Sequence, residues 1–127
     1  MRMKDVMTTN VVTIPSTTTL AEARRIMDAH NIKRLPVVDK NKLVGIVGKG
    51  ALESGGPSQL NTFSMHELTY MLNKITVADV MSKKLVTISP EATVEEGVAL
   101  AQKNKVGTTL IVDERGYLVG IATTNDL

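Results

Sequence analysis

The sequence contains no cysteine and almost no aromatic residues: of its 127 residues, two are Tyr, one is Phe and none is Trp. Without cysteine there is no disulfide, no thiolate nucleophile and no cysteine-ligated metal. So few aromatic rings also argue against the stacking platforms that bind single-stranded nucleic acid. No apolar run approaches the roughly 18 residues of a membrane-spanning helix, and the first ten residues lack the apolar segment of a signal peptide. We therefore expect a cytoplasmic protein with an aliphatic core.

Charged residues are not concentrated anywhere along the chain. The formal net charge is +2, and basic residues are scattered apart from short pairs such as Arg24-Arg25 and Lys33-Arg34. A nucleic-acid-binding stripe would be denser. His30 and His66 lack the spacing of metal ligands, and no nucleophile and base form a recognisable catalytic pattern. The sequence thus predicts neither an enzyme nor a metal site, and no cofactor is required.

The dominant pattern in the sequence is an internal duplication. The segment "KDVMTTNVVTI" at Lys4–Ile14 is matched 74 residues later by "ADVMSKKLVTI". In the same register "LPVVD" is matched by "TLIVD", and after a one-residue insertion "KLVGIV" is matched by "YLVGIA". Self-similarity at a fixed period indicates one structural unit used twice.

Each copy has the local signals of a β-α-β-β-α unit. The β-branched runs "VVTI" and "LVTI" predict strands. Capping boxes, Thr19-x-x-Glu22 and Thr93-x-x-Glu96, predict the start of a helix in each copy. Two apolar runs joined by a short polar turn then predict a β-hairpin.

The two copies differ after the hairpin. In the first, a Gly/Pro/Ser-rich loop at 53–63 precedes a helix at about 64–74, which begins with a Ser64-x-x-Glu67 capping box. The second copy reaches Leu127 before an equivalent helix, so we expect a longer natural protein. The prediction is an α+β (α/β-like) fold with repeat 1 at 1–74 and repeat 2 at 75–127.

The repeated motifs resemble those of the CBS domain, present twice as a tandem pair (a Bateman module). The motifs are "DVMTTNVVTI", "IKRLPVVD" and "KLVGIV", repeated as "DVMSKKLVTI", "VGTTLIVD" and "YLVGIATTNDL". The segment "SMHELTYMLNKITVADVM" is also similar to that of acetoin-utilisation (AcuB-type) CBS proteins, which implies a further C-terminal region such as an ACT-like domain. The resemblance implies two pseudo-twofold-related repeats packed through their sheets. It also implies two clefts for adenosine-containing ligands, a homodimer and a regulatory role.

The end of the second copy carries the polar groups of the candidate site. The family's ribose motif, Gly-apolar-x-Thr/Ser-x-x-Asp, is met in "GIATTNDL" by Thr123 and Asp126. A carboxylate can accept hydrogen bonds from both ribose hydroxyls, and charge-assisted bonds are the stronger kind. The matching "GIVGKGAL" has Gly48 and Ala51 instead. Thr-x-x-Asp before a helix is also a capping pattern, and the two roles can coexist.

By resemblance, residues of repeat 1 complete this site. Val11 and Ile32 would sandwich an adenine, and Lys33 or Arg34 would meet a phosphate. The other residues implied are Thr8, Thr13 and Pro36. Each of these roles has an equally open alternative: the apolar residues can simply pack in the core, and Lys33-Arg34 can be a solvated surface pair.

The mirrored cleft would use Gly48 and Ala51 with residues of repeat 2, namely Ser82, Leu85, Thr87, Val106 and Gly107. It lacks the ribose carboxylate, so we expect it to be empty or weak.

Two functions therefore remain open. The first is a regulatory module that senses AMP, ADP, ATP, S-adenosylmethionine or NAD in a cleft between the repeats. The second is a constitutive dimerisation or scaffold module whose clefts stay unoccupied. Neither reading requires a membrane or nucleic acid, and both imply a homodimer and an attached partner domain.

Overall fold

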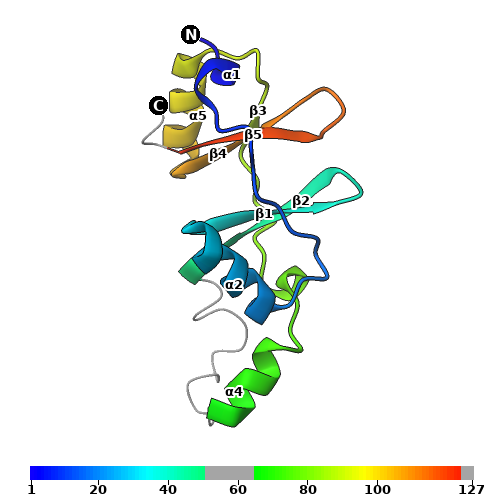
Figure 1. The fold of residues 1–127 in the computed structure, drawn as a ribbon. Helices are drawn as coiled ribbons and strands as arrows, with labels where there is room; N and C mark the ends of the chain where they lie inside the picture. The colour runs from blue at the N-terminus through cyan, green and yellow to red at the C-terminus, as the bar shows by residue number, and fades with distance from the viewer. Residues whose placement is uncertain (51–64, 124–127) are drawn as a thin grey trace. The chain divides into compact units, whose positions relative to one another are not determined.

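The structure, a computed structural model, describes residues 1–50 and 65–123 as helices joined to short strands (Figure 1). The elements are, in chain order, α1 (Met3–Val6), α2 (Leu20–His30), β1 (Arg34–Asp39), β2 (Lys42–Gly48), α4 (Met65–Leu72), the 3-10 turn η2 (Val77–Asp79), β3 (Thr87–Ile88), α5 (Val94–Asn104), β4 (Thr108–Val112) and β5 (Leu118–Thr123). This mixture confirms the predicted α+β fold. The predictions for the loop at 53–63, the Ser64 cap, Ala51 and Asp126 lie outside the described residues.

The chain divides into two compact units, and each contains pieces of both sequence repeats. Unit 1 is formed by Met1–Val11, Lys40–Leu43 and Lys84–Leu127, and unit 2 by Val12–Asp39 and Val44–Lys83. The segment that begins repeat 1 therefore belongs with most of repeat 2, and the segment that begins repeat 2 belongs with most of repeat 1. The predicted ranges 1–74 and 75–127 describe the duplication along the chain, whereas the compact units exchange their first segments.

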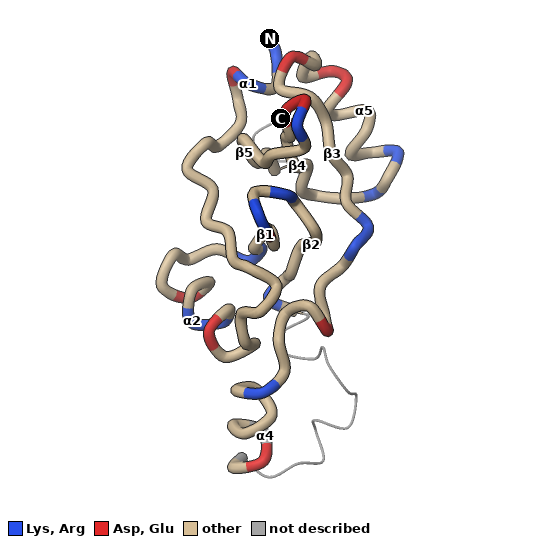
Figure 2. Tube along the Cα trace, turned by 90° about the vertical axis from the view of Figure 1, so that its right-hand side faces the viewer, with Lys and Arg blue, Asp and Glu red and all other residues tan. Residues whose placement is uncertain are grey.

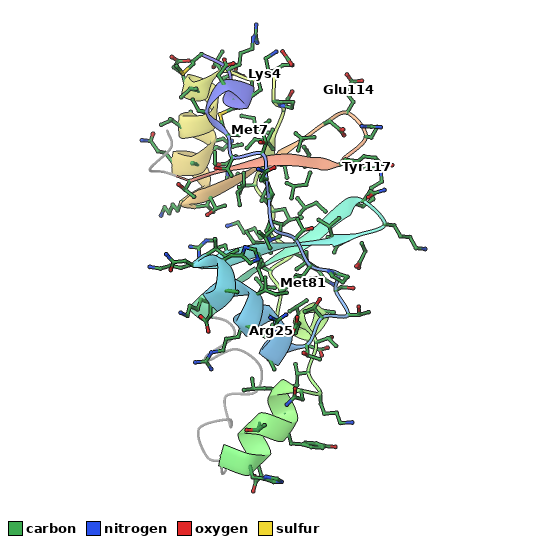
Figure 3. The ribbon with its side chains drawn as sticks, viewed as in Figure 1. Lys4, Met7, Arg25, Met81, Glu114 and Tyr117 are labelled. Carbon is green, nitrogen blue, oxygen red and sulfur yellow. The ribbon has the colours of Figure 1, made fainter. Side chains whose placement is uncertain are left out.

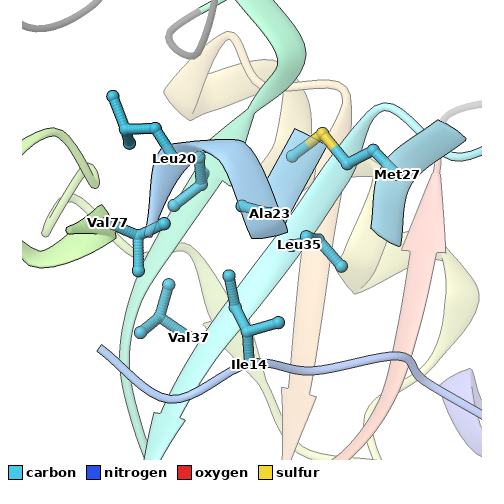
Figure 4. Packing of buried hydrophobic residues seen from close by; sticks show 8 residues of the cluster. Ile14, Leu20, Ala23, Met27, Leu35, Val37 and Val77 are labelled. Carbon is cyan, nitrogen blue, oxygen red and sulfur yellow. The ribbon is translucent and has the colours of Figure 1, made fainter. Parts of the chain in front are cut away.

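In unit 2, α2 packs on the hairpin of β1 and β2. Leu20, Ala23 and Met27 recur at three- and four-residue spacing, which places them on one stripe of the helix. The buried cluster around this stripe contains Ile14, Leu20, Ala23, Met27, Leu35, Val37, Val47 and Val77 (Figure 4). The core is aliphatic, as the composition requires.

The two long helices begin with different versions of the same cap. At α5 the predicted capping box is complete: the Glu96 amide donates to Thr93 Oγ1 at 3.1 Å, and the Thr93 amide donates to the Glu96 carboxylate at 3.2 Å. At α2 the Glu22 amide donates to Thr19 Oγ1 at 3.2 Å. The Glu22 carboxylate instead accepts from the Arg25 guanidinium at 2.9 Å. That hydrogen bond lowers the pKa of Glu22, so only half of the predicted box forms.

The first strand is also unequal in the two repeats. In unit 1, β3 pairs in parallel with β4, and the Leu110 amide donates to the Val86 carbonyl oxygen at 3.0 Å. In unit 2 the predicted strand "VVTI" is reduced to one parallel bridge between Ile14 and Val37. Pro36 occupies the position of Leu110 and has no N–H to donate. The equivalent hydrogen bond therefore cannot form, which limits the pairing to a single bridge.

Both predicted hairpins form, with different turns. Lys40 and Asn41 have φ angles of 50° and 67°, which suits a two-residue type I′ turn. In the longer second turn, the Asp113 carboxylate accepts from the amides of Arg115 and Tyr117 at 2.9 and 3.0 Å. Desolvation alone would raise the pKa of Asp113. The hydrogen bonds from Tyr117 and Arg115 outweigh it, so this pKa lies below its ordinary value.

The exchanged segments pack through side chains of complementary size. In unit 1, Met3 lies against Gly97 of α5, and a Cβ added to Gly97 would be 2.5 Å from Met3 Sδ. In unit 2 the matching positions hold Val77 and Ala23, both buried in its core cluster. A large side chain opposite glycine and a smaller one opposite alanine fill comparable space, as close packing requires.

This exchange predicts a compensating pair of substitutions. Gly97→Ala is expected to lower the free energy of unfolding by about 1 kcal/mol, because overpacking costs roughly 1–3 kcal/mol and the gain in helix propensity returns about 1 kcal/mol. Adding Met3→Val reproduces the Val–Ala pairing of unit 2 and should restore most of the loss. Urea denaturation of the two single variants and the double variant completes the thermodynamic cycle. A double variant less stable than Gly97→Ala would contradict this packing account.

Candidate ligand-binding site

The strand register sorts the side chains of unit 1 onto two faces. Across β4 and β5, Leu110 pairs with Ile121 and Thr108 pairs with Thr123. Because side chains alternate along a strand, these four side chains lie on one face. The residues of the same strands that belong to the core with Met3 lie on the other face. The first face is thus the one turned away from Met3 and α5.

Thr8 extends this face beyond β5. Its amide donates to the Ile121 carbonyl oxygen at 2.8 Å, and the Ile121 amide donates back to Thr8 at 3.0 Å. Directly opposed residues in an antiparallel pair share a face, so the Thr8 side chain lies on the same side as Thr123. Thr87 joins them because it pairs with Leu110. We name this surface the threonine face and define it by Thr8, Thr87, Thr108 and Thr123.

The threonine face combines hydroxyl groups with an apolar floor. Each Thr hydroxyl can both donate and accept a hydrogen bond. Thr8, Thr87 and Thr123 are exposed, whereas Leu110 on the same face is buried. A few polar groups arranged around apolar side chains are typical of small-molecule sites. The chemistry fits an uncharged ligand portion that has a ring and several hydroxyls.

The corresponding face of unit 2 has a different chemistry. The parallel bridge of Ile14 with Val37 brings Thr13 opposite Pro36, and Arg34 precedes Pro36 by two residues on β1. Thr13, Arg34 and Pro36 therefore share the face turned away from α2. We name this surface the arginine face and define it by Thr13, Arg34, Pro36 and Gly48. Relative to unit 1, Arg34 stands in place of Thr108, and Gly48 stands in place of Thr123.

The arginine face carries positive charge without a carboxylate partner among residues 1–50 and 65–123. Arg34 Nη1 lies 3.6 Å from the point where Gly48 would carry a Cβ, so the glycine leaves room for the guanidinium. The Lys33 carbonyl oxygen accepts from the Lys49 amide at 2.8 Å, and the Lys49 ammonium pairs with Asp28 at 3.4 Å. Within the described ranges, neither Lys33 nor Arg34 makes an ion pair. Both cations can accept an anion.

The predicted site residues fall into groups. Thr8 and Thr123 share the threonine face, and Thr13, Arg34 and Pro36 share the arginine face. Four predicted residues belong to neither face. Asp126 lies outside the described residues, and the other three are Val11, Ile32 and Lys33.

Ile32 follows α2, donates its amide to the Met27 carbonyl oxygen at 2.9 Å and packs against the unit 2 core. This position favours the core-packing interpretation of its side chain. Val11 is half-buried at the end of the first segment of unit 1.

Thr108 is a candidate that the sequence prediction did not include. It pairs directly with Thr123 across the β4–β5 hairpin. The alternation of "TTLIV" could have placed it opposite Thr123, but only with the hairpin register, which depends on the length of the turn. Thr87, assigned by sequence to the mirrored cleft, lies on the threonine face of unit 1.

Other kinds of site find little support in the described part of the chain. It contains no group of three or more His, Asp or Glu side chains able to hold a metal ion. Across the same residues, none of the helices has the length and apolar character needed to cross a membrane. Lys and Arg are spread along the trace rather than gathered on one element (Figure 2).

Comparison with known proteins identifies the duplicated unit. The sequence profile of the CBS domain matches residues 3–52 and again residues 77–127. The chain is 31% identical over 126 residues to an inosine-5′-monophosphate dehydrogenase of Thermoplasma acidophilum. The match covers 99% of this chain but only 23% of that enzyme.

Three solved structures share the fold over nearly the whole chain. A putative acetoin utilization protein (AcuB) from Vibrio cholerae is 30% identical with a TM-score of 0.80, covering 99% of this chain and 86% of that one. The CBS domain pair of protein MJ0100, in complex with 5′-methylthioadenosine and S-adenosyl-L-methionine, is 27% identical with a TM-score of 0.79, covering 99% and 91%. CBSX2 in complex with AMP is 25% identical with a TM-score of 0.79, covering 98% and 91%.

Proposed function

This chain belongs to the CBS domain family and carries the domain twice, and from that premise we propose that it is a regulatory module that binds an adenosine-containing ligand. The observation that supports the proposal most strongly is the pairing of Thr8 with Ile121, because it puts the Thr8 hydroxyl on the same face as Thr123. Thr123 belongs to the sequence motif that predicts ribose binding. Similar CBS pairs were solved with AMP and with adenosyl compounds.

The proposal gives each polar group a distinct role. Asp126 accepts hydrogen bonds from the ribose hydroxyls, and Thr8 and Thr123 bind the sugar or the polar edge of the base. Arg34 or Lys33 pairs with a phosphate or another anionic group, because each is a cation with no carboxylate partner in the described ranges. That one ligand uses both sets of residues stays a prediction.

The repeats are unequal in this proposal. Repeat 2 supplies the ribose motif, whereas the matching positions of repeat 1 are Gly48 and Ala51. The space left by the missing side chain of Gly48 lies next to the Arg34 guanidinium. The first repeat therefore presents a positive charge on this face, whereas the second presents threonine hydroxyls. We therefore propose one strong nucleoside site, with the mirrored site empty or weak.

A ligand panel tests the proposal. AMP, ADP, ATP, S-adenosylmethionine, 5′-methylthioadenosine and NAD are compared by thermal unfolding, with GMP and ribose 5-phosphate as controls. A ligand present at 100 times its dissociation constant should stabilise the protein by about 2.7 kcal/mol. We expect at least one adenosine compound to reach this shift and the controls to fall short of it. If none of the adenosine compounds raises the unfolding temperature, the chain is better described as a dimerisation or scaffold module than as a ligand sensor.

The wider biological role is also a proposal. As a regulatory module the chain would act on an attached domain or a partner, and a ligand can do so only if it binds two states with different affinity. The proposed homodimer can be checked by sedimentation equilibrium with and without the ligand found in the panel.

A further inference from the structure

At Thr8 itself, the backbone pairing with unit 1 is limited to one bridge. The antiparallel contact between Thr8 and Ile121 is an isolated bridge with two hydrogen bonds, of 2.8 and 3.0 Å. A hydrogen bond of this kind contributes only about 0.5–1.5 kcal/mol net. Further backbone hydrogen bonds hold Met1, Met3 and Lys4 to unit 1, but these residues lie at least four positions before Thr8. Side-chain packing next to Thr8 must therefore help to keep it in register with β5.

Met7 supplies the missing contact from the opposite side of the sheet. It is the C-cap residue that follows α1, and its amide donates to the Met3 carbonyl oxygen at 3.0 Å (Figure 3). Its sulfur and Cγ lie directly over Gly120, where any Cβ would collide with them. Met7 also packs against the core of Met3, Ile111 and Ala122. Because neighbouring side chains alternate, Met7 points into the core while Thr8 points to the threonine face.

Gly120 is the other half of this contact. It precedes Ile121, the backbone partner of Thr8, and its missing side chain is what lets Met7 approach the strand. The same arrangement occurs in unit 2, where Met81 lies against Gly45 and Ser82 bridges to Ile46. In unit 2, however, the sequence positions that match Thr123 and Asp126 are Gly48 and Ala51, which have no hydroxyl or carboxylate.

From this geometry we propose that Met7 is a positioning residue for the ligand site, and that its packing on Gly120 sets how often Thr8 is in place to bind. The inference rests on the proposed function. If the bridge opens, the binding-competent fraction falls and the apparent dissociation constant rises by the inverse of that fraction. Met7 touches no ligand in this account, since its side chain lies on the core side.

The test compares Met7→Ala with Met81→Ala, which removes the equivalent contact from unit 2. The dissociation constant for the best adenosine compound of the panel is measured by calorimetry. Hydrogen exchange of the Ile121 amide reports the Thr8 bridge. We expect Met7→Ala to raise the dissociation constant by about tenfold and to speed exchange at Ile121. Met81→Ala should change the affinity by less than about twofold, and Met7→Leu, which refills the space, should recover most of the affinity.

Two outcomes overturn the inference while leaving the proposed function intact. One is a wild-type protein that binds and a Met7→Ala variant that binds equally well. The other is an equal loss in Met7→Ala and Met81→Ala, which would indicate general destabilisation instead of positioning. A wild-type protein that binds none of the adenosine compounds refutes the proposed function itself, and the inference falls with it.

Discussion

Replacing Met3 with alanine is expected to lower the free energy of unfolding by about 2–5 kcal/mol, the usual cost of deleting a large buried side chain. Met3 is fully buried although it is only the third residue of the chain. It packs against Gly97 and joins Ile111 and Ala122 in the core of unit 1. The matching residue of repeat 2, Val77, does not replace it, because Val77 is buried in the core of unit 2.

The measurement is urea denaturation combined with amide hydrogen exchange. Exchange should accelerate most at Ile121, whose amide donates to Thr8, and least at Val38, whose amide donates to Ile14 in unit 2. Thr9→Ala is the matched control, because Thr9 is exposed on the same segment, and it should change stability by less than about 0.5 kcal/mol. If Met3→Ala lowered the protection of the Val38 amide from exchange but not that of the Ile121 amide, Met3 would not belong to the core of unit 1.

The second large effect concerns affinity. Asp126→Ala is expected to raise the dissociation constant for an adenosine ligand by at least about 100-fold. The substitution removes two charge-assisted hydrogen bonds to the ribose, which are worth roughly 1.5–3 kcal/mol each, and each 1.4 kcal/mol is a tenfold change. Calorimetry with AMP and with 2′-deoxy-AMP tests this role, because 2′-deoxy-AMP lacks one of the two ribose hydroxyls. Wild type should prefer AMP, and the variant should bind both nucleotides with similar affinity.

Glu95→Ala is the control for this experiment, because it removes the same charge from an exposed position on α5. It should change the affinity by less than about twofold. If Asp126→Ala keeps both its affinity and its preference for AMP, the Asp126 carboxylate does not bind the ribose.

Local signals in the sequence predicted most elements of the fold because they were strong and repeated. The Thr93 capping box, the aliphatic stripe of α2 and both hairpins appear where those signals lie. The predicted strand "VVTI" forms only one bridge, because the neighbouring strand carries Pro36, which has no N–H to donate. This effect depends on which strands pair, so the local sequence does not reveal it. The box at Thr19 is half-formed because Arg25 competes for the Glu22 carboxylate.

The exchange of first segments could not be read from local patterns. The motif "DVM" occurs at the start of both repeats, and nothing in it says which repeat receives Met7 or Met81. The difference appears only in long-range packing, where the large Met3 lies against Gly97 while the smaller Val77 shares a core with Ala23. For the same reason, only the family resemblance groups Thr8 with Thr123 in the sequence. The bridge between Thr8 and Ile121 explains why their side chains lie on the same face of the sheet.

The most direct test of the central claim is to map bound AMP on the protein by amide chemical shifts of the isotope-labelled chain. We expect saturable shifts centred on the threonine face and on the arginine face, with the largest at Thr8, Thr123 and Arg34, and weak shifts along α5. Shifts centred on α4 or on the outer surface of α5, or no saturable shift at millimolar AMP, would contradict the account.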